Sequence, residues 1–171
     1  MAPKTTIAKL DRELSAEEKE AFHREAEGRM KTFSYRKPPQ QRAAKDVVLL
    51  GNTSLASVLV QVVRDGGENN LHYHTGSDTC WFVIKGRVRF YGVGNKVIGE
   101  FGPQDGIIMP GGARYWFEKT GPDELELLQV IAKDSTKPFP MAGAYDRVNL
   151  EPAKAWMDDD PALQVYEKAP R

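Results

Sequence analysis

The feature of this sequence that most limits its fold is a run of short strand-type segments between residues 45 and 134. Each segment is rich in apolar and β-branched residues, and turns such as Asp65-Gly66-Gly67 and Pro110-Gly111-Gly112 separate neighbours. Evenly spaced short strands with Gly, Pro and Asn turns are typical of a β-sandwich or a closed barrel. The sequence therefore predicts an all-β domain over residues 45–134. The expected strands are Val47–Leu50, Leu55–Val63, Leu71–His74, Thr79–Ile84, Val88–Tyr91, Val97–Phe101, Ile107–Met109, Arg114–Glu118 and Leu125–Ile131.

The segments on either side of this domain have a different character. Residues 1–44 are charged, and Ser15 followed by Glu18 is a capping-box pattern that predicts a helix ending before Ser34, since Pro38 and Pro39 favour an extended segment. Residues 135–171 are rich in proline, and we expect an irregular tail that packs on the barrel. Because barrel-edge strands need covering, we expect the N-terminal arm to dock across a two-fold axis in a homodimer.

Composition excludes several classes of function. A chain of 171 residues with 40% hydrophobic residues can bury one core, and its 24 basic and 24 acidic residues give a net charge of zero. A balanced chain lacks the basic face that nucleic acids or a polybasic membrane anchor require, so we expect neither partner. The single cysteine, Cys80, excludes an internal disulfide and fits a reducing compartment. With no signal-type segment and no long apolar run, we expect a cytoplasmic protein.

The residues that indicate chemistry are His72 and His74. On a strand, residues two apart project from the same face, so the two imidazoles lie side by side. Such a pair is a bidentate clamp for a metal ion, and it is equally compatible with two histidines that hold no metal.

The wider spacing around these histidines resembles the cupin family. Gly66, His72, His74 and Gly86 fall on the first cupin motif, and the stretch 104–115 is similar to the second. The resemblance covers about residues 51–132 and implies a double-stranded β-helix, a jelly-roll barrel with its site in the lumen. It also implies a homodimer and a divalent metal ion (Fe, Mn, Ni or Zn), with no nucleotide cofactor.

Three positions depart from the family pattern. The usual glutamate ligand is replaced by Thr79, the usual last histidine by Tyr115, and the glycine that opens the second motif by Gln104. Asp78 is close enough in sequence to complete a two-histidine, one-carboxylate set with His72 and His74, which suits non-haem iron. Asp78 is equally compatible with a turn residue that accepts hydrogen bonds from backbone amides.

Three functions follow as hypotheses. The first is a small-molecule enzyme, an oxygenase or an isomerase/lyase, with a divalent metal held by His72 and His74. The second is a metal-free epimerase or isomerase in which a histidine and Tyr115 act as the acid/base pair. The third is a barrel that binds a small metabolite without catalysis. The side chains expected to contact the small-molecule ligand are Trp81, Phe117, Gln129 and Gln61, of which Trp81 and Phe117 would form an apolar wall.

Overall fold

The computed structural model describes residues 13–38, 44–134 and 147–152, and the chain divides into two units at Thr32/Phe33. In the first unit, helix α1 (Ala16–Glu27) begins at the expected capping box. The Ser15 hydroxyl accepts a hydrogen bond from the Glu18 amide (3.2 Å), and the Glu18 carboxylate accepts one from the Ser15 amide (2.8 Å). Two of the amides that a helix start leaves unpaired are thereby satisfied. The first unit ends at Thr32, and the division of the chain into an arm of residues 1–44, a barrel and a tail stays a prediction.

The second unit contains a five-stranded antiparallel sheet in the order β1-β2-β9-β4-β7. Its strands pair through apolar segments, and the register of β4 against β9 places Trp81 directly opposite Gln129. Residues directly opposite each other share a face of the sheet, so these two side chains point the same way. The strands are β1 (Lys45–Asn52), β2 (Ala56–Val63), β4 (Ser77–Lys85), β7 (Gly106–Met109) and β9 (Leu125–Lys133).

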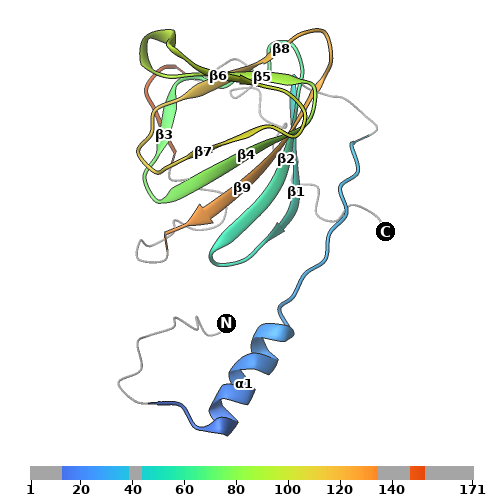
Figure 1. Cartoon of the computed structure of the whole chain (residues 1–171), viewed down its shortest axis with the longest axis vertical. Coiled ribbons are helices and arrows are strands. Elements are labelled where there is room, and N and C mark those ends of the chain that lie inside the picture. The colour runs from blue at the N-terminus through green and yellow to red at the C-terminus, as the bar shows by residue number, and fades with distance from the viewer. Residues whose placement is uncertain (1–12, 39–43, 135–146, 153–171) are drawn as a thin grey trace. The chain divides into compact units, whose positions relative to one another are not determined.

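The facing layer consists of two smaller sheets, β6-β5-β8 and β10-β3 (Figure 1). Their members are β3 (His72–His74), β5 (Arg87–Tyr91), β6 (Val97–Phe101), β8 (Trp116–Thr120) and β10 (Arg147–Asn149), with a 3-10 turn η1 (Val93–Asn95) between β5 and β6. A bridge joins them, in which His72 and Tyr115 exchange two backbone hydrogen bonds of 3.1 and 3.0 Å. The result is the predicted two-layered, jelly-roll type of β-barrel.

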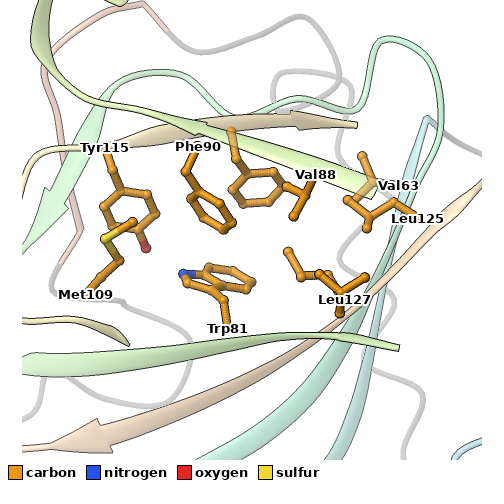
Figure 2. Packing of buried hydrophobic residues seen from close by; sticks show 10 residues of the cluster. Val63, Trp81, Val88, Phe90, Met109, Tyr115, Leu125 and Leu127 are labelled. Atoms are coloured by element: carbon orange, nitrogen blue, oxygen red, sulfur yellow. The ribbon is translucent and has the colours of Figure 1, made fainter. Parts of the chain in front are cut away.

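The core lies between the two layers (Figure 2). Trp81, Phe90 and Phe117 are each no more than 1% exposed, and their ring centroids lie 5.2–6.2 Å apart. Side chains alternate along β4, so Trp81 faces the core while the next residue, Phe82, is 40% exposed on the outer face. The packed core is therefore the interior of the barrel, which we call the lumen.

Each of the nine expected strands coincides with a strand of the structure to within two residues at either end. The tenth, β10, lies in the segment that we had expected to be irregular, and it pairs with β3. The rest of the C-terminal segment, including the part expected to pack on the barrel, lies outside the described residues. The homodimer stays a prediction. In the described ranges no helix is both long and apolar enough to cross a bilayer.

One departure from the family pattern has a structural consequence that can be measured. Gln104 occupies the position of the family glycine with a φ of 73°, a left-handed conformation in which a side chain is disfavoured. We predict that Gln104→Gly stabilises the protein by about 1 kcal/mol, measured as the free energy of unfolding in urea. Gln129→Gly, at a buried strand position, serves as a comparison and should be destabilising. A stability loss in Gln104→Gly would contradict the prediction.

Candidate functional site

The two histidines lie on the short strand β3, and their side chains share a face as the spacing predicted. His72 is 1% exposed and His74 is 8% exposed. Their ring centroids are 5.2 Å apart and the rings are nearly perpendicular, at 86°. The structure thus brings both imidazoles together in a buried environment.

A backbone carbonyl fixes the tautomer of His72. The Nδ1 atom lies 2.8 Å from the carbonyl oxygen of Asn70, and because a carbonyl only accepts, Nδ1 carries the proton and Nε2 keeps its lone pair. Burial lowers the pKa of His72 to about 3, and the nearby charge of Arg147 adds to the effect. His72 is therefore neutral at physiological pH, with Nε2 available as an acceptor.

Tyr115 lies directly against His72. The two residues face each other across the backbone bridge, and their ring centroids are 4.6 Å apart. Tyr115 is 1% exposed, and Figure 2 shows its hydroxyl directed into the lumen near Trp81 and Met109. The histidine and the tyrosine of the hypothesised acid/base pair thus lie side by side, because Tyr115 bridges to β3 immediately before β8 begins.

Trp81 contributes a buried donor. Among the described residues its indole Nε1 has no hydrogen-bond acceptor, and Figure 2 shows this nitrogen on the side of the ring that faces Tyr115 and Met109. By contrast, the indole of Trp116 donates to the Asn95 side-chain oxygen at 3.1 Å. A buried N–H without an acceptor costs about 1–3 kcal/mol, so the Trp81 donor is suited to a polar atom of a bound molecule.

The other predicted contact residues also face the lumen. Gln129 lies opposite Trp81 and accepts a hydrogen bond of 2.8 Å from the Gln61 amide. Phe117 is fully buried in the aromatic core. Gln61 and Gln129 are therefore placed beside Trp81, whereas Phe117 packs the barrel between Trp81 and Phe90.

Asp78 does not join the histidines. It is exposed, since it has the opposite orientation to the buried residues Ser77 and Thr79 on β4. Its carboxylate accepts a hydrogen bond of 2.8 Å from the amide of Gly111. Strand alternation turns Asp78 away from the lumen, so the two-histidine, one-carboxylate set is not assembled, and the backbone-anchoring alternative describes this residue.

Sequence reasoning missed Arg147 on β10. This residue lies directly opposite His74 in the β10–β3 ladder, so its side chain is on the face of the histidines. Its guanidinium donates to the side-chain oxygens of Asn70 and, at 2.8 Å, Asn149. Burial lowers the pKa of Arg147 to about 10, which leaves it charged at neutral pH. The alternation of polar and apolar residues in Arg147-Val148-Asn149-Leu150 is the signal that indicates this strand.

These residues do not fit a divalent metal ion. In residues 13–38, 44–134 and 147–152, no group of three histidine, cysteine or carboxylate side chains is arranged to hold one. Thr79 and Tyr115 stand where the family has charged or imidazole ligands. The neighbouring charges that act on His72 are those of Arg147, His74 and Lys45, and each of them lowers its pKa, as a positive charge does. Two imidazoles beside Arg147, with no carboxylate in the described part of the site, disfavour a further cation.

The fold and the buried histidine pair define a two-layered β-barrel with a polar site at one end of its lumen. The sequence profile of the Cupin domain matches residues 59–131, and no curated protein sequence matches the chain. The barrel belongs to the cupin superfamily. Cupin domains often bind divalent metal ions.

Solved structures agree with this assignment. The RmlC-like cupin of Desulfovibrio desulfuricans is 18% identical with a TM-score of 0.50, over 60% of this chain and 97% of that one. The Cnp3 cupin domain of Schizosaccharomyces pombe is 15% identical with a TM-score of 0.52, over 60% and 75%. A cupin superfamily protein of Desulfitobacterium hafniense is 17% identical with a TM-score of 0.50, over 62% and 99%. At these identities the likeness shows the fold alone.

Proposed function

We propose that this cupin barrel binds a small polar organic molecule at the end of the lumen formed by His72, Tyr115 and Trp81, and that it needs no metal ion to do so. The observation that carries the proposal is the buried Trp81 indole N–H, which has no acceptor in the described part of the chain and faces Tyr115. A preformed donor inside an aromatic lumen is the arrangement that small-molecule sites use to orient a ligand.

The chemistry that these groups support is proton transfer. His72 offers an unprotonated Nε2 at neutral pH, although burial lowers its pKa to about 3 and so makes it a weak base. Tyr115 offers a hydroxyl on a ring whose centroid is 4.6 Å from that of the imidazole. An acceptor and a donor at one buried point can remove a proton from a carbon acid and return it, which is the reaction of an isomerase or epimerase. Among the functions considered from the sequence, this one uses the groups that the structure assembles, whereas the metal enzyme lacks its third ligand.

Nuclear magnetic resonance of the indole groups tests the binding site. The chain has three tryptophans, and the Trp81 indole signal is assigned by its loss in Trp81→Phe. In a fragment screen that includes neutral and charged compounds, we expect binders to move the Trp81 signal and to leave that of Trp116 in place, because Trp116 already donates to Asn95. A screen in which no fragment moves the Trp81 signal would contradict the proposal.

Deuterium exchange tests the chemistry on the fragments that bind. We expect fragments with a C–H next to a carbonyl to gain deuterium in heavy water faster with the protein than without it. Tyr115→Phe should slow this exchange by about 100-fold or more, since one proton-transfer group contributes about 10²- to 10⁴-fold. Binding with no enhanced exchange would identify the barrel as a binding protein without catalysis.

A further inference from the structure

We infer that the ligand of this site is an organic carboxylate and that Arg147 on β10 is the residue that recognises it. This inference rests on the proposed function, because it names the class of molecule that the His72 end of the lumen takes. The inference assigns Arg147 and strand β10, which lie outside the cupin motifs, to the site, and it requires the ligand to be negatively charged.

Arg147 is held in place by its neighbours. Its backbone pairs with β3 opposite His74, and its guanidinium donates through Nη2 to the Asn70 side chain and through Nε to the Asn149 side chain. Asn70 is fully buried, and its own amide donates to the carbonyl of Glu151 at 2.9 Å. The cation is therefore positioned before any ligand arrives, which reduces the entropy lost on binding.

The charge of Arg147 has no carboxylate partner among the described residues. Other arginines of the barrel do have one, as Arg64 pairs with Asp46 at 2.8 Å and Arg89 pairs with Glu100 at 2.7 Å. A partly buried guanidinium is costly unless an anion neutralises it. This contrast between Arg147 and the other arginines is what points to an anionic ligand.

The free donors of the site match a carboxylate. A guanidinium has five N–H hydrogens, and the two hydrogen bonds to Asn70 and Asn149 leave three of them, including a pair on adjacent nitrogens. Such a pair binds the two oxygens of a carboxylate side by side. Tyr115 is near enough to Arg147 to act on its pKa, and its hydroxyl faces Trp81 in Figure 2.

The surroundings favour an organic acid over inorganic phosphate. The rings of Tyr115 and Trp81, which border the site, suit an apolar part of a ligand. His72 is neutral, and so it adds no second positive charge for a doubly charged phosphate. Arg147 with aromatic rings beside it matches an organic acid that has an apolar or aromatic part.

Matched pairs of acids and amides test the inference in the wild-type protein. Benzoate and benzamide have nearly the same shape, as do phenylacetate and phenylacetamide, and each is titrated against the Trp81 and Trp116 indole signals. We expect the acids to move the Trp81 signal saturably and to bind about 10- to 100-fold more tightly than the amides, the usual range for hydrogen bonds to charged groups. Inorganic phosphate should leave the signal in place.

Two variants assign the effect to Arg147. Arg147→Gln should lose the preference for acids over amides, whereas Arg89→Gln, which removes an arginine already paired with Glu100, should keep it. Thermal unfolding checks that both variants are folded. If Arg147→Gln is unstable, the ratio of acid to amide affinity in the wild type still tests whether the site prefers a carboxylate.

The possible results separate the two proposals. Equal binding of acids and amides at Trp81, tighter binding of phosphate, or an unchanged preference in folded Arg147→Gln would overturn the carboxylate inference while the ligand site stands. If no compound of either kind moves the Trp81 signal, both the inference and the proposed function fail.

Discussion

Lowering the pH from 7 to 3 is expected to destabilise the protein through His72 by an amount on the order of 5 kcal/mol. The pKa of this histidine is lowered from 6.5 to about 3 in the folded state, chiefly by burial. Between these two values the unfolded chain binds a proton that the folded chain does not. The contribution of His72 to the free energy of unfolding is therefore fully present above pH 6.5, and it falls by about 1.4 kcal/mol per pH unit as the pH decreases toward 3. Urea unfolding at a series of pH values measures this slope.

Two variants isolate the contribution of His72 from that of the carboxylates. In His72→Asn the dependence of stability on pH between pH 6.5 and 4 should weaken by up to about 1.4 kcal/mol per pH unit, which corresponds to one proton. The new side-chain amide can still donate toward the Asn70 carbonyl. His23→Asn, at an exposed position of helix α1, serves as the control substitution. An identical slope in wild type and His72→Asn would show that His72 is not held neutral.

Replacing Phe117 by alanine is expected to cost about 3–5 kcal/mol of stability. Phe117 is fully buried, its ring centroid lies 5.2 Å from that of Trp81 and 5.3 Å from that of Phe90, and the Lys45 ammonium lies 4.8 Å above it. Truncation removes aromatic contacts with both layers and leaves a cavity between them. For a domain of this size, the expected loss corresponds to a fall in Tm of roughly 10 °C.

Phe82→Ala is the matched control for this core variant. Phe82 lies on β4 next to Trp81 but points outward and is 40% exposed, so its truncation should cost about 1 kcal/mol or less. Equal losses in the two variants would contradict the assignment of inner and outer faces. Phe117→Leu, which keeps most of the side-chain volume, should recover part of the stability.

The barrel could be predicted because its signals are local. Alternation of apolar residues places Trp81 inside and Phe82 outside, and glycines such as Gly66 and Gly86, both with positive φ, mark the turns between strands. These features depend on neighbours in the sequence, which is why nine strands coincide with the structure. Strand β10 was missed because three residues within a proline-rich segment give a weak periodic signal, and its pairing with β3 is a long-range contact.

The site could be predicted only in part, for a similar reason. His72 and His74 share a face by spacing alone, and Tyr115 follows from the family motif, so their proximity was foreseeable. Asp78 was wrongly placed because a turn was expected to let it swing inward, whereas it already belongs to β4 with outward orientation. Arg147 enters the site through β10, about 73 residues after His74, and no local pattern connects the two.

The most direct test of the central claim is the metal content of the purified protein after incubation with Fe(II), Mn(II), Ni(II) or Zn(II) and removal of excess ion. His72→Ala/His74→Ala serves as the control for metal bound elsewhere. Because the described residues supply two imidazoles beside Arg147 and no carboxylate to complete a ligand set, we expect the wild type to retain no more metal than the double variant. Near-stoichiometric metal that disappears in the double variant would contradict the account and establish a metal centre on β3.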